Sequence, residues 1–351
     1  MSKLCRNLFL LFGFAAIVVM CFTMKVEKEV LLSSLRNAGF YLPGVLGVWV
    51  IVYAFNARAF QLIVNTGSHE RHLSYRHAYK LTVSGFAFSY TTPFGFGGGP
   101  YRVMELSSYI GVPHAMSSVV LYSMMHILSH ICLWFFSAVL FVVFYFDLMS
   151  PLLWVIFGLF AAVVLGVFIL FRFFYTRGVL VRLFKPLLRI PLVRRPAARF
   201  FEKHADSMQE VDDNIAYIHS RPRVFKYSLL HEFLARVVNA MEYYLILLSL
   251  NVSLTYVDAI LVLAFSSLIG NLLFFLPMQL GAREGGLSLA VRFLGLSAPG
   301  IGVFTGIYTR IRELFWIFIG VTLVKVGNRR LMRCVFPERA ILYDSSIHYY
   351  I

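Results

Sequence analysis

The sequence predicts an all-α integral membrane protein, a polytopic helix bundle built from two inverted repeats that each contain a Pro/Gly-broken re-entrant hairpin. The first observation is composition, because 59% of the 351 residues are hydrophobic and only 14% are charged, whereas about a quarter of a soluble domain is charged. The second is a series of apolar runs of about 20 residues, the length that crosses a bilayer. The third is a pair of broken apolar runs at matching positions in the two halves of the chain.

Six apolar runs are long enough to cross a hydrocarbon core about 30 Å thick. They cover residues 4–24, 40–62, 115–146, 151–174, 227–250 and 301–326. Lys3 and Arg6, ahead of the apolar stretch from Leu8 to Met20, are also typical of a signal peptide, but bulky Met20, Phe22 and Met24 stand where small residues would mark a cleavage site. We therefore expect the first run to be retained as a helix.

Basic residues set the expected orientation of these spans. The net charge is +15, and the Lys and Arg residues gather in segments 58–80, 172–226 and 325–339, each beside an apolar run. Such loops lie in the cytoplasm under the positive-inside rule, so we expect both termini there. Basic residues that flank apolar spans argue against nucleic acid as a partner. None of the four cysteines forms a CxxC pair, so we expect free thiols at Cys5, Cys21, Cys132 and Cys334.

Two further apolar segments, 79–112 and 257–296, are broken near their middle. Proline removes an amide donor and glycine loosens a helix, so the breaks expose polar backbone groups. Lipid cannot satisfy those groups, whereas a protein-lined cavity can. We therefore predict two re-entrant hairpins whose breaks contain Pro93, Gly97, Gly98, Gly99 and Pro100 in the first, and Pro277, Gly281 and Gly285 in the second.

The two breaks belong to an internal repeat. Pro93 and Pro277 are 184 residues apart, and each half contains two spans, a broken hairpin and another span. Paired breaks in inverted halves indicate a binding site near the middle of the membrane; the alternative is that two kinks only shape helix packing. We expect a single domain made of a first half (1–174), a basic amphipathic insert (175–226), a second half (227–326) and a tail (327–351).

Residues of the basic insert repeat at helical spacing beyond Pro196. The apolar members are Phe201, Ala205, Met208, Val211, Ile215 and Ile218, and acidic residues lie between them. This pattern predicts a helix that packs on the bundle; docking of a partner protein is the alternative.

Charged residues lie beside both breaks and within the later spans. A charge inside the membrane costs about 2.5–3.5 kcal/mol on insertion scales, so each needs a partner or a task. Because arginine binds phosphate through two parallel hydrogen bonds, we predict a site for a phosphate-bearing lipid head group. Its residues are Arg102, Glu105, Arg283, Glu284, Arg310, Glu313 and Glu242. The alternative is that each Arg pairs with its own Glu and only stabilises the fold.

Two histidines, His126 and His130, lie one helical turn apart in the span 115–146. That spacing suits a metal, but no acidic or thiol ligand is near in sequence, so we predict a polar lining of the same site, without metal or cofactor. Glu232 is expected to pair with Arg236 on the next turn, whereas Glu242 has no such partner. The sequence contains no nucleophile elbow, P-loop or metalloprotease motif.

The residues of the two breaks resemble the motifs of a known family. Thr92-Pro93-Phe94, the glycines to Gly99, Pro100 and Arg102 are similar to the first motif of the lysylphosphatidylglycerol synthase transmembrane-region family. The run from Pro277 to Gly285, followed by Arg310, is similar to its second motif. The resemblance extends from about residue 8 to 326 and implies the flippase-like domain of the bacterial multiple-peptide-resistance factor.

The resemblance implies a bacterial inner-membrane protein that moves a phospholipid between leaflets, with an anionic or aminoacylated head group. Two departures from the family matter. No aminoacyl-transfer domain is expected after Phe336, so we expect a transporter rather than an enzyme. The span after the first hairpin has Ser123, His126, Ser129 and His130 in place of the Glu-Arg pair often found there.

Two other functions remain alternatives. The first is an intramembrane transferase acting on a lipid-linked substrate, with Glu105 or His126 as base. The second is an accessory subunit whose basic insert docks an enzyme of membrane-lipid synthesis.

Overall fold

The computed structural model describes residues 39–66, 72–92, 97–177, 209–217, 221–272, 282–296 and 301–335, and within them the side chains outside 170–177, 282–284, 301–303 and 325–335. These residues form helices and turns, with no strand among them. The all-helical prediction is therefore confirmed for this part of the chain. The predicted span 4–24, most of the basic insert and the tail from 336 lie outside the described residues.

Five helices cover the predicted spans that follow the first one. They are α3 (Tyr41–Val64), α6 (Val112–Phe144), α7 (Pro151–Arg177), α10 (Pro222–Ser249) and α13 (Ile301–Val335), with a short 3₁₀ turn, η2 (Phe146–Leu148), between α6 and α7. Within the described residues, α3, α6 and the Pro151–Ile169 part of α7 are long and apolar enough to cross a membrane. Both α10 and α13 are longer than α3 but carry more charged side chains, so their crossing stays a prediction.

The two broken segments each form two short helices. These are α4 (Tyr75–Thr91) and α5 (Gly98–Ile110), then α11 (Tyr256–Leu272) and α12 (Ala282–Phe293). The breaks are narrower than predicted, since Gly98, Gly99 and Pro100 begin α5 and Gly285 lies in the first turn of α12. A proline fits there because first-turn amides have no acceptor within the helix. Pro93, Pro277 and Gly281 lie outside the described residues.

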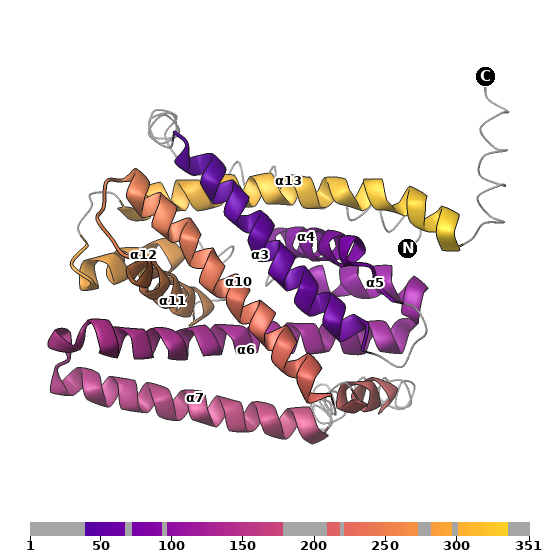
Figure 1. Cartoon of the computed structure of the whole chain (residues 1–351), viewed down its shortest axis with the longest axis horizontal. Helices are drawn as coiled ribbons and strands as arrows, with labels where there is room; N and C mark the ends of the chain where they lie inside the picture. The colour runs from indigo at the N-terminus through magenta and orange to yellow at the C-terminus, as the bar shows by residue number, and fades with distance from the viewer. Residues whose placement is uncertain are drawn as a thin grey trace, which may run out of the picture.

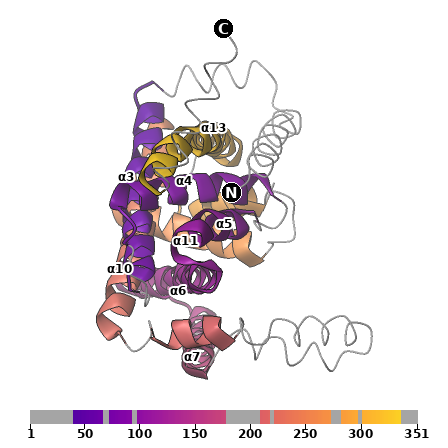
Figure 2. The same ribbon diagram turned by 90° about the vertical axis from the view of Figure 1, so that its right-hand side faces the viewer.

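Helices α3 and α10 contact each other along the diagonal of the molecule and run in opposite directions (Figure 1). Helices α6 and α13 lie apart from each other and also run in opposite directions (Figure 1). The short helices pack between them, with α4 against α13 and α11 against α6. Viewed from the side, α4, α5 and α11 occupy the interior of the bundle (Figure 2).

Among the described helices, α7 makes its main contact with α6. Its apolar side chains are exposed, including Leu152, Val155, Leu159 and Val163. So large a contiguous apolar surface is rare on a soluble protein. The exposed face of α7 therefore identifies a surface that lies in lipid.

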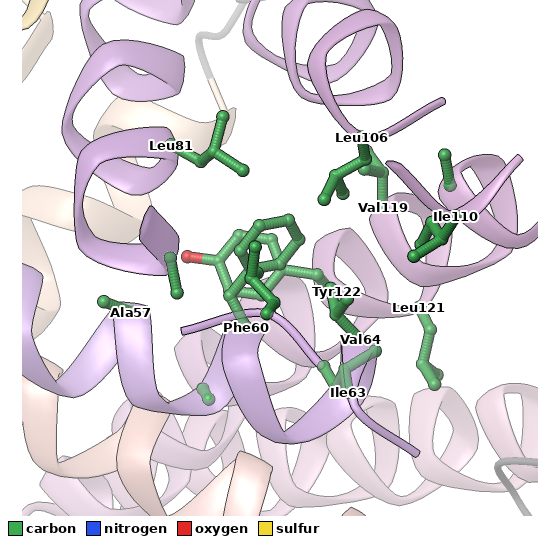
Figure 3. Close-up of a cluster of buried hydrophobic side chains, with 14 of the residues drawn as sticks. Ala57, Phe60, Ile63, Val64, Leu81, Leu106, Ile110, Val119, Leu121 and Tyr122 are labelled. Carbon is green, nitrogen blue, oxygen red and sulfur yellow. The ribbon is translucent and has the colours of Figure 1, made fainter. Parts of the chain in front are cut away.

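A large apolar cluster joins α3, α4, α5 and α6 at one end of the bundle. The rings of Phe60 and Tyr122 lie together between Leu81 and Leu106 (Figure 3). Val211 and Ile215, from the helix at 209–217 in the basic insert, belong to the same cluster and are fully buried. The predicted helix packed on the bundle is therefore confirmed for residues 209–217; Phe201, Ala205, Met208 and Ile218 lie outside the described residues.

The contact between α4 and α13 depends on Gly320. The Ser84 hydroxyl donates a hydrogen bond of 2.9 Å to the Gly320 carbonyl. A Cβ atom added at Gly320 would lie 2.5 Å from the Ala87 Cβ and 2.9 Å from the Val83 carbonyl oxygen. No flexible side chain can move aside to relieve this clash, so the helices must separate.

We therefore expect Gly320→Ala to destabilise the protein by about 1–3 kcal/mol, the usual range for overpacking. Gly158→Ala on α7 is the matched control, since no atom lies within 4 Å of a Cβ built there and alanine is the better helix former. Thermal unfolding in detergent measures both. Equal melting temperatures for the two variants would contradict the packing of α4 on α13.

Candidate functional site

Arg102 on α5 is buried among aromatic rings from three other helices. Its side chain is 5% exposed, and its guanidinium carbon lies 5.9 Å from the ring centre of Phe60, 5.2 Å from that of Phe86 and 5.1 Å from that of Tyr122. Ring faces attract a cation at these distances. The rings thus hold the guanidinium in place without occupying its N–H groups.

The fourth side of Arg102 is the backbone of α4 at Gly85. A Cβ atom at Gly85 would lie 2.4 Å from Arg102 Nε and 2.8 Å from Nη2. Any larger residue would displace the guanidinium, so the sequence places a glycine where α4 must approach the cation closely.

Two N–H-bearing atoms of Arg102, Nε and Nη2, have no hydrogen-bond partner. The predicted partner, Glu105 on the next turn, forms no ion pair with Arg102, and its Oε1 also lacks a partner. The purely structural pairing therefore fails for these two residues. A buried polar group left unpaired costs about 1–3 kcal/mol, and more when charged, so these donors mark a place for a ligand.

Glu232, His126 and Arg236 form a connected set next to Arg102. Arg236 Nη2 donates to His126 Nε2 at 2.6 Å, and His126 Nδ1 lies 2.8 Å from Glu232 Oε2. The sequence predicted a direct Glu232–Arg236 pair near the membrane surface, but Glu232 is fully buried and the histidine ring of α6 lies between the two. Glu232 is also close enough to Arg102 to interact with it electrostatically. We call Arg102, Glu105, His126, Glu232 and Arg236 the Arg102 cluster.

A second buried set, the Glu242 cluster, consists of Trp49, Glu242, Arg310, Arg312 and Glu313. Glu242 accepts from the Trp49 indole at 2.8 Å and from Arg312 Nε at 3.0 Å. Arg310 Nη1 donates to Glu313 at 2.7 Å, and Arg312 Nη2 lies 3.8 Å from the same carboxylate. The predicted Arg310–Glu313 pair is therefore present, and Glu242 has a partner that the helical spacing did not reveal.

Aromatic side chains separate the two clusters. Tyr53 lies 5.3 Å from Trp49, 5.4 Å from Phe86 and 4.9 Å from Trp316, measured between ring centres. Phe86 continues the contact to His126 at 5.5 Å. A layer of aromatic side chains in the centre of the bundle thus separates the two sets of charges.

The structure brings the predicted residues into two groups. Arg102, Glu105 and His126 lie in the first and Glu242, Arg310 and Glu313 in the second, whereas the side chains of Arg283 and Glu284 lie outside the described residues. His130 packs edge-on to His126, with 5.6 Å between ring centres. The sequence did not identify Trp49, Tyr122 or the reach of Arg312, because aromatic residues are common in apolar spans and Arg312 lies on a different face from Arg310.

The chain was compared with protein families, curated proteins and solved structures. The family model described as "Lysylphosphatidylglycerol synthase TM region" matches residues 9–320. The curated proteins and the solved structures gave no match. A match over most of the length agrees with the membrane-exposed face of α7 and the buried charges. The chain therefore belongs to the lysylphosphatidylglycerol synthase transmembrane-region family.

Proposed function

We propose that this protein is a lipid translocase that moves a phospholipid head group between the two leaflets through the interior of the helix bundle. The observation that carries the proposal is Arg102, a buried arginine with two unpaired N–H-bearing atoms. A guanidinium presents its donors in a fork that matches a phosphate. The acyl chains would stay in the bilayer while the head group binds at the Arg102 cluster.

An inverted repeat would give such a protein alternating access to a central site. Helix contacts support it: α3–α4, α4–α5 and α5–α6 correspond to α10–α11, α11–α12 and α12–α13, and α4–α13 corresponds to α11–α6. The opposite directions of α3 and α10, and of α6 and α13, fit halves related by an axis in the membrane plane (Figure 1).

The 184-residue offset of the repeat also recurs in backbone detail. Gly111 and Gly295, at the ends of α5 and α12, both have positive φ, of 85° and 71°. The Gly85–Arg102 contact has its counterpart in Ile269–Gly286, where a Cβ on the glycine would lie 3.0 Å from the isoleucine Cβ. The two halves use the same close approach, but only the first half places a cation there.

Helix lengths support re-entrant hairpins. Helices α4 and α5 have 17 and 13 residues, and α11 and α12 have 17 and 12. At about 1.5 Å per residue each is shorter than a hydrocarbon core of about 30 Å. The proposed orientation places the α4–α5 hairpin on the cytoplasmic side, next to basic loop 58–80, in the inner membrane of a bacterium.

The two clusters receive different roles in this proposal. The Arg102 cluster contacts the head group, and His126, with His130 beside it, lines its path. The Glu242 cluster, in which Arg310 and Glu313 also pair, holds α3, α10 and α13 together around it. Arg283 and Glu284, at the start of α12, would contribute at the second hairpin.

The contacts of His126 argue against this residue as the base of the transferase alternative, which leaves Glu105 as the other candidate base. An arginine is always protonated, so its hydrogen bond to Nε2 requires that nitrogen to be an acceptor. Nδ1 then carries the proton and donates it to Glu232. Neither ring nitrogen is left to accept a proton from a substrate, as a general base must.

Reconstitution into liposomes tests the proposal. Vesicles containing the purified protein and a trace of a fluorescent phospholipid are treated with a membrane-impermeant reductant that destroys the outer-leaflet label. A translocase exposes the inner-leaflet label as well, so the reduced fraction should rise from about half toward completion. Protein-free vesicles are the control, and identical traces with a panel of head groups would refute translocation.

Gly85→Ala provides a variant that keeps every charge. Its Cβ would overlap the Arg102 guanidinium, which can move because it is the end of a flexible side chain. We expect lipid translocation to fall at least about tenfold while the melting temperature changes little, since alanine favours the helix. Gly47→Ala, with no atom within 4 Å of its Cβ, should translocate at the wild-type rate; equal rates for both variants would contradict the placement of the site.

A further inference from the structure

The two buried clusters differ in their balance of charge. In the Glu242 cluster, Arg310 and Arg312 are matched by Glu242 and Glu313, and nitrogen–oxygen distances of 2.7 to 3.8 Å connect all four. Two positive and two negative charges cancel there. Arg312 Nη1 also lacks a hydrogen-bond partner, but the four charges pair with one another, so the set is neutral without a charged ligand.

The Arg102 cluster has a neighbour that the sequence placed only among the residues of a basic loop. Lys80 on α4 buries its Nζ atom, which has no hydrogen-bond partner. It interacts electrostatically with Glu105, yet no ion pair joins the two residues. Glu105 is 9% exposed, so both groups are withdrawn from solvent without neutralising each other by contact.

With Lys80 included, this region has an excess positive charge. Lys80, Arg102 and Arg236 contribute three positive charges, whereas Glu105 and Glu232 contribute two negative ones. His126 is neutral because Arg236 donates to its Nε2. In the sequence, segments 93–96 and 273–281 contain no charged residue, and Arg283 and Glu284 carry opposite charges. One negative charge is therefore needed to make the site neutral.

The position of that charge follows from the unpaired atoms. Among the three cations, Arg236 already bonds to His126 and Ser129. The donors left are Arg102 Nε and Nη2, and Lys80 Nζ. Along α4, Lys80 precedes Gly85, against which Arg102 packs, by about 7.5 Å at 1.5 Å per residue. Lys80 is thus nearer to the start of α4 at Tyr75, and Arg102 lies deeper.

We infer that the translocated lipid carries one net negative charge, as a phosphodiester head group without a cationic group, and that Lys80 receives this phosphate before Arg102 binds it. The inference rests on the proposed lipid translocation and names the class of lipid that its site binds. Glu105, one helical turn beyond Arg102 and electrostatically coupled to Lys80, keeps Lys80 from holding the phosphate too firmly. A zwitterionic head group would leave the site with its excess charge, and an aminoacylated cationic one would increase it.

Native mass spectrometry of the intact, purified protein tests this charge selectivity. The protein is titrated with phosphatidylglycerol, phosphatidylethanolamine and lysylphosphatidylglycerol of identical acyl chains, whose net charges are −1, 0 and +1. We expect phosphatidylglycerol to bind at least about tenfold more tightly than the other two. Lys80→Gln and Arg102→Gln should each remove most of this preference, and Glu105→Gln should increase it.

Arg58→Gln is the matched control, because it removes an arginine that is exposed and bonded only to Gln61 among the described side chains. Arg58→Gln should keep the preference for phosphatidylglycerol. If the preference came only from a general attraction of anionic lipid to a basic protein, this variant would weaken it. Equal affinities for the three lipids, or a preference lost equally in Arg58→Gln, would overturn the inference. Selective binding of phosphatidylglycerol without translocation in liposomes would support the charge assignment and refute the translocase. Translocation without selective binding would support the translocase and refute the charge assignment.

Discussion

Arg102→Gln should abolish most lipid translocation while leaving the protein as stable as the wild type, or more stable. The guanidinium contributes charge-assisted hydrogen bonds to a phosphate of about 1.5–3 kcal/mol, which corresponds to a loss of about ten- to a hundredfold. In the unliganded protein the same guanidinium is buried without a carboxylate in contact. Its removal therefore relieves a desolvation cost and breaks no ion pair.

Translocation rates in liposomes and melting temperatures in detergent measure the two effects together. Arg58→Gln removes an exposed arginine and should change neither quantity. If Arg102→Gln unfolds the protein, the guanidinium stabilises the fold through its contacts with the rings of Phe60, Phe86 and Tyr122, and the site must be sought elsewhere. Full activity in a well-folded Arg102→Gln protein would be equally damaging.

Glu242→Ala should destabilise the protein strongly. It leaves Arg312 and the Trp49 indole buried without their acceptor, and breaking one side of a buried pair costs about 3–5 kcal/mol. Because α3, α10 and α13 each contribute to this cluster, we expect loss of the folded fraction on size-exclusion chromatography. The guanidinium carbon of Arg312 also lies 4.1 Å from the ring centre of Trp49. Moving this side chain toward solvent would lose that contact.

A double variant distinguishes the loss of the ion pair from the cost of leaving one charge buried without a partner. Glu242→Leu with Arg312→Leu removes both partners, and such apolar replacements of buried pairs are often neutral. The double variant should therefore be more stable than Glu242→Leu alone. A double variant as unstable as the sum of its single variants would show that the two residues act independently, against the 3.0 Å bond between them.

The bundle could be predicted from the sequence because lipid imposes simple rules. Apolar length identified α3, α6 and α7, and the prolines and glycines identified the interruptions between α4 and α5 and between α11 and α12. The first and last residues of the breaks could not be predicted, since a proline is compatible both with a loop and with the first turn of a helix. Pro100 illustrates this.

The partners of the buried charges were harder to predict, because they come from distant parts of the chain. Arg310 and Glu313 lie three residues apart, so helical spacing revealed their contact. Arg312 and Glu242 are 70 residues apart, and His126 is 106 residues from Glu232. Nothing in local spacing distinguishes the bonded arginine from the unbonded one. That distinction, which singles out Arg102, required the packing of α3, α4, α5 and α6.

The most direct test of this account is a cryo-electron microscopy structure of the protein in a nanodisc containing phosphatidylglycerol. The account predicts a lipid phosphate about 2.7–3.1 Å from Arg102 Nε and Nη2, enclosed by Phe60, Phe86 and Tyr122, with the Glu242 cluster unchanged. An Arg102 that instead bonds Glu105 or Glu232, with no lipid between the hairpins, would contradict it.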